Sequence, residues 1–289
     1  MEKTLVGKDG WLFLKNDGCK ELEVHCNNLC IPNEARQRSR YSPHLDKYCI
    51  TIFPNKSFMY AAYLPDEYPV KYRPGFDVYK NIFGDRLLDG CEVLKGEDET
   101  FYKTDTHINF RGAYLVYCSW IRHVNQLFSL NLQAVDIPII RKTVPSLSGL
   151  GIGIGDLTWP LNCGSTIIAD TSDVYFYSDT AVAESPYMKY RVGAGSIRLL
   201  TSALEDITDS YNGTLDWPIL SSCILFIRNA GTIGKRVLIF YDSFLISTMS
   251  LYMNIFNETY MAKKIYDPAL VDLVKPDYVF EFRAERFLL

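Results

Sequence analysis

From residue 235 onward, short apolar runs alternate with helical patterns, and this alternation restricts the fold more than any other feature of the chain. Strands are predicted at 235–240, 258–266 and 278–282, and helical segments at 243–257 and 267–274. Strands that alternate with helices usually pair in parallel, and a parallel sheet carries helices on both faces. The sequence therefore predicts an α/β fold with a mostly parallel sheet.

The rest of the chain adds elements around this core. Further strands are expected at 11–14, 49–53 and 173–177, helices at 33–47, 77–88 and from the N-cap Asn109 to about 128, and an extended polar segment at 102–107. The segment from about 136 to 229 is rich in Gly, Ser, Thr and Pro and reads as a less regular, insertion-like region. No composition shift marks a domain boundary, so residues 1–289 are predicted to form a single domain.

Composition excludes several classes of protein. The net charge is −4 and no Lys/Arg block occurs, so no nucleic-acid partner is expected. No apolar run reaches the roughly 20 residues that span a bilayer, and the first residues show no signal peptide. The eight cysteines are scattered and suit buried thiols of the cytoplasm. Cys19, His25, Cys26 and Cys30 lie near one another without the paired Cys-x-x-Cys spacing, so neither metal nor cofactor is predicted.

Two polar clusters carry the chemistry that the sequence offers. Asp242 and Ser243 directly follow the apolar run 237–240, so the serine hydroxyl is expected at the edge of the sheet, where a helix begins. Asp105 and His107 stand two residues apart on the segment predicted to be extended, which places both side chains on one side. Together these residues supply a nucleophile, a base and a group that orients the base, as serine-based acyl transfer requires.

A structural interpretation applies to both clusters. Asp-Ser after a strand is more often a helix N-cap than a catalytic pair, and the residues before Asn109 also fit capping. The distance between the clusters cannot be read from spacing. If Ser243 is a nucleophile, its amide at the start of a helix is an expected donor to an oxyanion.

Several stretches, in the same order, resemble the alginate O-acetylation proteins of the AlgX/AlgJ type, which belong to the SGNH-hydrolase-like superfamily. The matching stretches are Gly7-Lys8-Asp9-Gly10-Trp11-Leu12-Phe13-Leu14, Phe53-Pro54-Asn55-Lys56-Ser57, Tyr63-Leu64-Pro65, Thr104-Asp105-Thr106-His107 with Asn109 and Gly112, Gly155-Asp156-Leu157, Asp242-Ser243-Phe244, Lys275-Pro276-Asp277 and Glu285-Arg286-Phe287-Leu288. The likeness spans nearly the whole chain, and the combination is far more specific than any single stretch.

The resemblance implies a fold, a site and a reaction. The implied fold is a flavodoxin-like three-layer α/β/α sandwich, circularly permuted relative to ordinary SGNH hydrolases because the Asp–His pair precedes the serine. It implies Ser243 as nucleophile, His107 as general base and Asp105 as its orienter. The implied reaction is transfer of an acetyl group to polysaccharide hydroxyls through an acetyl-serine intermediate. The partners implied are a polysaccharide or oligosaccharide acceptor, an acetyl donor of unknown identity and a membrane-bound acetyl-transfer protein. The family is usually periplasmic or exported, which leaves the compartment open.

Three further residues are predicted to contact substrate. Tyr241 stands where the family usually has Gly, and its side chain is expected to crowd the turn or line the pocket. Trp159 lies in a Gly/Pro-flanked loop and could stack on a sugar ring. Arg286 could anchor a carboxylate of the substrate, with an internal ion pair as the alternative. The alternating glycines of 149–155 lack the Gly-Lys-Ser/Thr ending of a phosphate loop and predict a flexible loop.

Two other functions fit the same residues. A carbohydrate acetylesterase would use the identical site with water in place of the sugar hydroxyl. A non-catalytic polysaccharide-binding or assembly protein would keep the fold without the activity, and Tyr241 beside the nucleophile is the feature that favours it.

Overall fold

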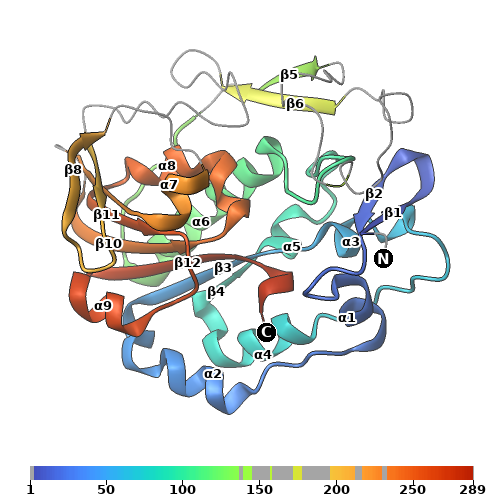
Figure 1. Cartoon of the computed structure of the whole chain (residues 1–289), viewed down its shortest axis with the longest axis horizontal. Coiled ribbons are helices and arrows are strands. Elements are labelled where there is room, and N and C mark those ends of the chain that lie inside the picture. Colours follow the sequence, from blue (N-terminus) through green and yellow to red (C-terminus); the bar gives the residue numbers. More distant parts are fainter. Residues whose placement is uncertain are drawn as a thin grey trace.

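The computed structural model describes residues 3–136, 139–144, 157, 172–177, 196–211, 217–229 and 233–288. Its centre is an eight-stranded sheet with the strand order β4-β3-β12-β10-β11-β9-β7-β8 (Figure 1). The strands, in that order, are Leu87–Asp89, Tyr48–Phe53, Tyr278–Ala284, Ile233–Tyr241, Phe256–Ala262, Ile224–Arg228, Ser196–Leu200 and Asp206–Tyr211. The first five strands pair in parallel, and β9, β7 and β8 are added by antiparallel pairing, so the predicted mostly parallel sheet is confirmed.

Helices cover both faces of this sheet (Figure 1). On one face lie α6 (Phe110–Phe128), the 3₁₀ helix η6 (Ser243–Thr248) and α8 (Met249–Met253). On the other lie α2 (Glu34–Tyr41), α4 (Pro74–Phe83) and α9 (Pro268–Val274). Each face therefore buries its own apolar cluster, as a parallel sheet requires.

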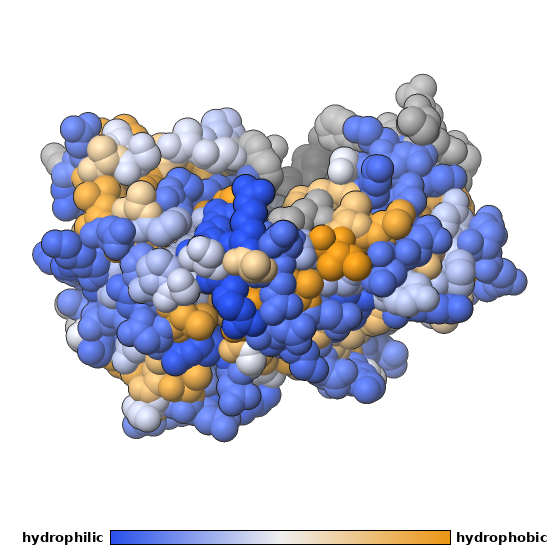
Figure 2. Space-filling model, turned by 90° about the horizontal axis from the view of Figure 1, so that it is seen from below, coloured by the Kyte–Doolittle hydropathy of each residue, from blue (hydrophilic) through white to orange (hydrophobic). Residues whose placement is uncertain are grey.

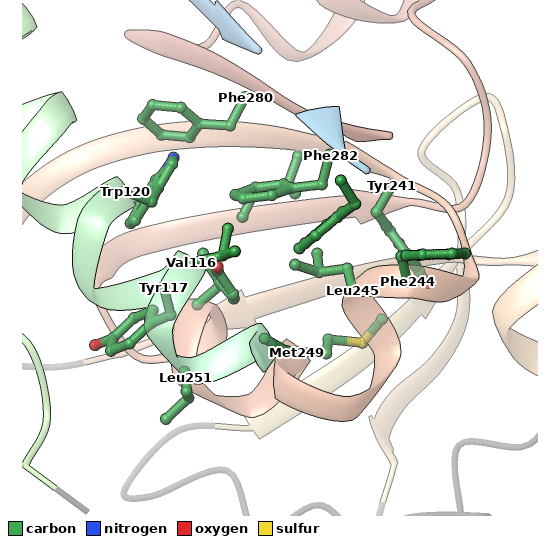
Figure 3. Close-up of a cluster of buried hydrophobic side chains, with 14 of the residues drawn as sticks. Val116, Tyr117, Trp120, Tyr241, Phe244, Leu245, Met249, Leu251, Phe280 and Phe282 are labelled. Atoms are coloured by element: carbon green, nitrogen blue, oxygen red, sulfur yellow. The ribbon is translucent and has the colours of Figure 1, made fainter. Parts of the chain in front are cut away.

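The apolar cluster under α6 joins the helix to the central strands. Figure 3 shows Trp120 of α6 close to Phe280 and Phe282 of β12. The Trp120 ring is fully buried, and its centroid lies 5.0 Å from that of Phe280 in an edge-on arrangement. Such aromatic contacts add to the free energy of burial and fix the position of the helix. Because the residues just before α6 include His107, this packing also sets where the histidine lies.

Smaller elements complete the chain. They are β1 (Thr4–Val6), β2 (Leu12–Leu14), α1 (Glu21–Asn27), η2 (Ser42–Lys47), α3 (Lys56–Met59), α5 (Gly90–Leu94), β5 (Ile139–Val144), β6 (Ser172–Tyr177), α7 (Trp217–Ser222) and η7 (Glu285–Phe287). Strands β1 and β2 pair antiparallel, and so do β5 and β6. Part of the region predicted to be irregular thus forms regular structure, since β7, β8 and β9 extend the main sheet.

Most predicted elements are confirmed, and five differ. The strand expected at 258–266 ends at Ala262, and the helix expected at 33–47 is α2 followed by the 3₁₀ helix η2. The helix expected at 77–88 ends at Phe83, because Gly84 adopts a positive φ and the chain then forms β4. The helix expected at 243–257 is η6 followed by the single turn of α8, because β11 already begins at Phe256. The segment 102–107 is a series of bends and not an extended strand.

In the part of the chain that the structure describes, no helix is both long and apolar enough to span a bilayer. Figure 2 shows the face that carries α1, α2 and α4 as mainly hydrophilic with hydrophobic patches between.

Candidate active site

Ser243 lies at the carboxyl end of β10, the strand between β12 and β11. Asp242 precedes it and caps η6: its Oδ1 accepts a hydrogen bond from the Phe244 N–H at 2.9 Å, and its Oδ2 accepts one from the Ala284 N–H at 2.6 Å. Burial raises the pKa of Asp242, and these two N–H donors oppose that rise. The capping interpretation is therefore right for Asp242, whose two oxygens fix the turn that presents Ser243.

His107 and Asp105 reach Ser243 from the loop before α6. The Ser243 hydroxyl lies 2.8 Å from His107 Nε2, and His107 Nδ1 lies 2.6 Å from Asp105 Oδ1. A carboxylate can only accept here, so Nδ1 carries the proton and Nε2 is left to accept from the serine O–H. The side chains of His107 and Asp105 remain 28% and 25% exposed, so the group is open to solvent on one side. The two clusters of the sequence are one site in space.

The bends of the loop bring Asp105 and His107 together. Asp105 Oδ1 also accepts a hydrogen bond from the His107 backbone N–H at 2.8 Å, an Asx turn that folds the carboxylate toward the ring. Asn109 Oδ1 then caps α6 by accepting from the Gly112 N–H at 2.9 Å, as predicted. A Cβ on Gly112 would lie 2.5 Å from the Thr100 carbonyl oxygen, so glycine is required for the helix to approach the loop.

Arg286 lies beside the group formed by Asp105, His107 and Ser243, and it makes the internal ion pair that the sequence left as its alternative. Its guanidinium donates to Glu21 Oε2 at 3.3 Å and to Thr106 Oγ1 at 3.2 Å. Its side chain is 8% exposed, and Glu21 also accepts a 2.5 Å hydrogen bond from the Ser57 hydroxyl. Arg286 thus links Thr106, the residue between Asp105 and His107, to the buried carboxylate of Glu21 through hydrogen bonds.

Tyr241 does not stand between Ser243 and His107. Its ring is 1% exposed and lies in the apolar cluster among Phe244, Leu245 and Phe282 (Figure 3). Its hydroxyl has no hydrogen-bond partner in the described residues, and burial raises its pKa. Trp159 and the segment 149–156 lie outside the described residues, so their predictions are untested.

Tyr241→Phe should leave any reaction of Ser243 with an activated ester unchanged and should not lower stability. The substitution removes only a buried hydroxyl that lacks a partner, and removing such a group is neutral or stabilising. Steady-state rates and thermal unfolding of the variant and the wild type check this. An activity loss of tenfold or more would show that the hydroxyl takes part in the reaction.

A hollow opens at the carboxyl end of β11. It has a volume of about 350 Å³ and is lined by residues of α7, β9, β11, α9 and the segments between them, among them Ser221 and Lys263. Burial lowers the pKa of Lys263 to about 8, and the Asp242 charge partly opposes this shift. Over the described ranges, His, Cys, Asp and Glu side chains nowhere gather in groups of three or more that could hold a metal.

Comparisons with known proteins agree on the fold. PatB1 of Bacillus cereus superposes with a TM-score of 0.64 at 15% identity, covering 99% of this chain and 96% of PatB1. A DHHW family protein from Eubacterium siraeum gives 0.60 at 14%, covering 99% and 94%. The O-acetyltransferase domain of Pseudomonas putida AlgJ gives 0.53 at 16%, covering 99% and 91%. PatB1 has also been solved with a sulfonyl adduct. No family model and no curated protein matches the sequence.

These likenesses confirm the resemblance to the AlgX/AlgJ type at the level of the fold. They extend over nearly the full length of the chain and of each structure. At 14–16% identity they do not carry an activity to this chain.

Proposed function

We propose that the protein is a carbohydrate O-acetyltransferase that uses Ser243, His107 and Asp105. The observation that carries this proposal is the continuous hydrogen-bonded chain from the Ser243 hydroxyl through both nitrogens of His107 to Asp105. A serine is nearly inert at neutral pH unless a base takes its proton, and here a correctly protonated imidazole lies within reach. The fold shared with an O-acetyltransferase domain supports the same reaction class.

The proposed reaction has two half-steps. His107 Nε2 takes the Ser243 proton while Oγ attacks the carbonyl carbon of the acetyl donor, and the donor's leaving group then receives that proton from His107. The acetyl-serine is next attacked by a sugar hydroxyl whose proton passes to His107, and Ser243 leaves as the alcohol. In each half-step Asp105 stabilises the imidazolium that forms.

The negative oxygen of each tetrahedral intermediate needs donors. The Ser243 N–H is the first of η6, where no intrahelical acceptor is available, and it remains our proposed oxyanion donor. The same proposal includes a flavodoxin-like fold that is circularly permuted. It also includes a polysaccharide acceptor and a membrane-bound acetyl-transfer partner.

The fate of the acetyl group tests the function. The purified protein is incubated with an activated acetyl ester, with and without oligosaccharide acceptors, and products are followed by mass spectrometry. A transferase should give acetylated sugar and little free acetate once acceptor is present, because acceptor competes with water for the acetyl-serine. Acetate release that acceptor does not reduce would replace this proposal with an esterase. If neither an acetyl adduct nor a product forms, the proposal is replaced by that of a non-catalytic polysaccharide-binding protein.

A sulfonyl fluoride provides a donor-independent check. PatB1 accepts a sulfonyl adduct, and such reagents trap activated nucleophiles. One sulfonyl group on Ser243, located by peptide mapping, is the expected result. Labelling at other residues with Ser243 unmodified would contradict the assignment of the nucleophile.

A further inference from the structure

The ammonium of Lys56 lies beneath the loop that carries Asp105 and His107. Lys56 directly follows the Pro54-Asn55 break at the carboxyl end of β3, and the residue is 3% exposed. Its Nζ donates to three backbone carbonyls of the loop: Tyr102 O at 3.2 Å, Lys103 O at 3.1 Å and Asp105 O at 2.7 Å. Three carbonyl dipoles of one loop thus converge on a single cation, and the shortest contact is to the residue that orients the histidine.

Aromatic rings of the N-terminal hairpin enclose the same ammonium. Nζ lies 5.9 Å from the centroid of the Trp11 ring and 5.5 Å from that of Phe13, distances at which a desolvated cation is attracted to a ring face. The hairpin also holds the loop directly, because the Leu12 N–H donates to Lys103 O at 3.0 Å. The Trp11 ring in turn stacks on Tyr60 at 4.2 Å.

The loop depends on such contacts because it has no regular structure of its own. Between the single bridge pair Phe101–Ile108, the described backbone forms only bends. A loop without ladder hydrogen bonds takes its shape from the groups that bind its carbonyls. Here these are the Lys56 ammonium and the backbone N–H groups of Leu12 and Leu157. The orientation of the Asp105 carboxylate depends on the position of its backbone, and Lys56 binds the carbonyl of that same residue.

We propose that Lys56 is a positioning residue: by binding the carbonyls of residues 102, 103 and 105 it holds Asp105 and His107 in line with Ser243. This inference rests on the proposed function, since it deepens the account of the same site. The role proposed for Lys56 is exerted through the loop, whose carbonyls it binds, and not through contact with substrate. The sequence offered no role for it beyond its place in the Phe-Pro-Asn-Lys stretch.

Removing the ammonium and returning it in solution tests the proposal. Lys56→Ala should lower the acetylation rate of Ser243 by about 10²-fold, the effect expected when a catalytic group moves by roughly 1 Å. Methylammonium should restore a large part of the lost rate, because it can occupy the vacated space and donate to the carbonyls. Tetramethylammonium carries the same charge and binds aromatic rings but has no N–H donor, so it should not restore the rate. Equal rescue by both cations, or none by either, would overturn the proposal.

Lys103→Ala is the matched control. The Lys103 ammonium lies at the same 5.9 Å from the Trp11 ring, but it donates to Asp9 O and to none of the three carbonyls. Its loss should change the rate less than twofold. A loss comparable to that of Lys56→Ala would indicate that the charge near Trp11, and not the carbonyl contacts, governs the site.

A spectroscopic measurement separates this inference from the proposed function. The His107 Nδ1–H hydrogen bond to Asp105 should give a far-downfield proton resonance, absent from His107→Gln. We expect that resonance to disappear in Lys56→Ala and in Lys56→Met, which keeps the apolar stem, and to return with methylammonium in the alanine variant. Thermal unfolding of the methionine variant checks that its fold persists. A resonance that survives in both variants would overturn the positioning role, even if the protein transferred no acetyl group.

Discussion

Ser243→Ala should abolish formation of the acetyl adduct and reduce acetyl transfer by about 10³-fold or more, leaving only what binding and oxyanion donors provide. Alanine lacks the hydroxyl that would form the ester, whereas His107 and Asp105 remain in place. Intact-protein mass after incubation with an activated acetyl ester, together with the rate of donor consumption, gives the measurement. The serine is half-buried, so the loss of its hydroxyl should not unfold the protein.

The control is Ser42→Ala, which removes an exposed serine hydroxyl at the start of η2, a segment that packs toward the other face of the sheet. It should retain the adduct and the rate of the wild type. An adduct of normal mass and rate on Ser243→Ala would show that another residue is the nucleophile, and peptide mapping would then identify it.

Asp105→Asn should lower the acetyl-transfer rate by on the order of 10³-fold while leaving the fold intact. The amide oxygen of asparagine can still accept from the His107 backbone N–H, but the negative charge that stabilises the imidazolium is gone. Pre-steady-state formation of the acetyl-serine shows the effect directly. Combined with Ser243→Ala, the substitution should cause no further loss, because the two residues act as one unit.

Asp77→Asn provides the comparison for charge alone. Asp77 is exposed on α4, which covers the opposite face of the sheet, and its replacement also removes one negative charge. It should keep the wild-type rate. A rate for Asp105→Asn within a few-fold of the wild type would show that the short contact to His107 does not serve catalysis.

The candidate site could be anticipated from the sequence because its parts are local patterns. An apolar run ending in Asp-Ser predicts a polar turn at the edge of a sheet, and β10 and Asp242 have that structure. The N-cap of α6 could likewise be predicted from the Asn109 side chain and from the helical spacing of the apolar residues that follow it. Order along the chain and the family resemblance, not spacing, linked Asp105 and His107 to Ser243.

Features that depend on distant contacts were missed. Strand β4 has three residues and joins the sheet only through backbone pairing with β3, so no periodicity marks it. The helix after Ser243 is short because Phe256 must begin β11 at the register that β10 sets. Arg286 meets Glu21 across 265 positions of sequence, and its residue type alone allowed either a substrate contact or an ion pair.

Lys56 illustrates the same limit within the site. Its partners lie 46 to 49 positions away and are backbone carbonyls, which every residue carries. A motif comparison can therefore identify Lys56 as part of the stretch 53–57 that resembles the family. The proposed role of Lys56 follows only from its contacts in the folded structure.

Strand β12 has a consequence for the order in which the protein can mature. It separates β3 from β10 in the sheet, yet it is the last of the eight strands to leave the ribosome. Until it emerges, β3 and β10 have no shared sheet neighbour, and Asp242 lacks the Ala284 N–H that holds its turn. A nascent chain that already contains Asp105, His107 and Ser243 would still lack the strand that joins β3 to β10 in the sheet. The reactivity proposed for Ser243 should thus arise only after synthesis has passed residue 284, so unfinished chains should not be acylated on the ribosome.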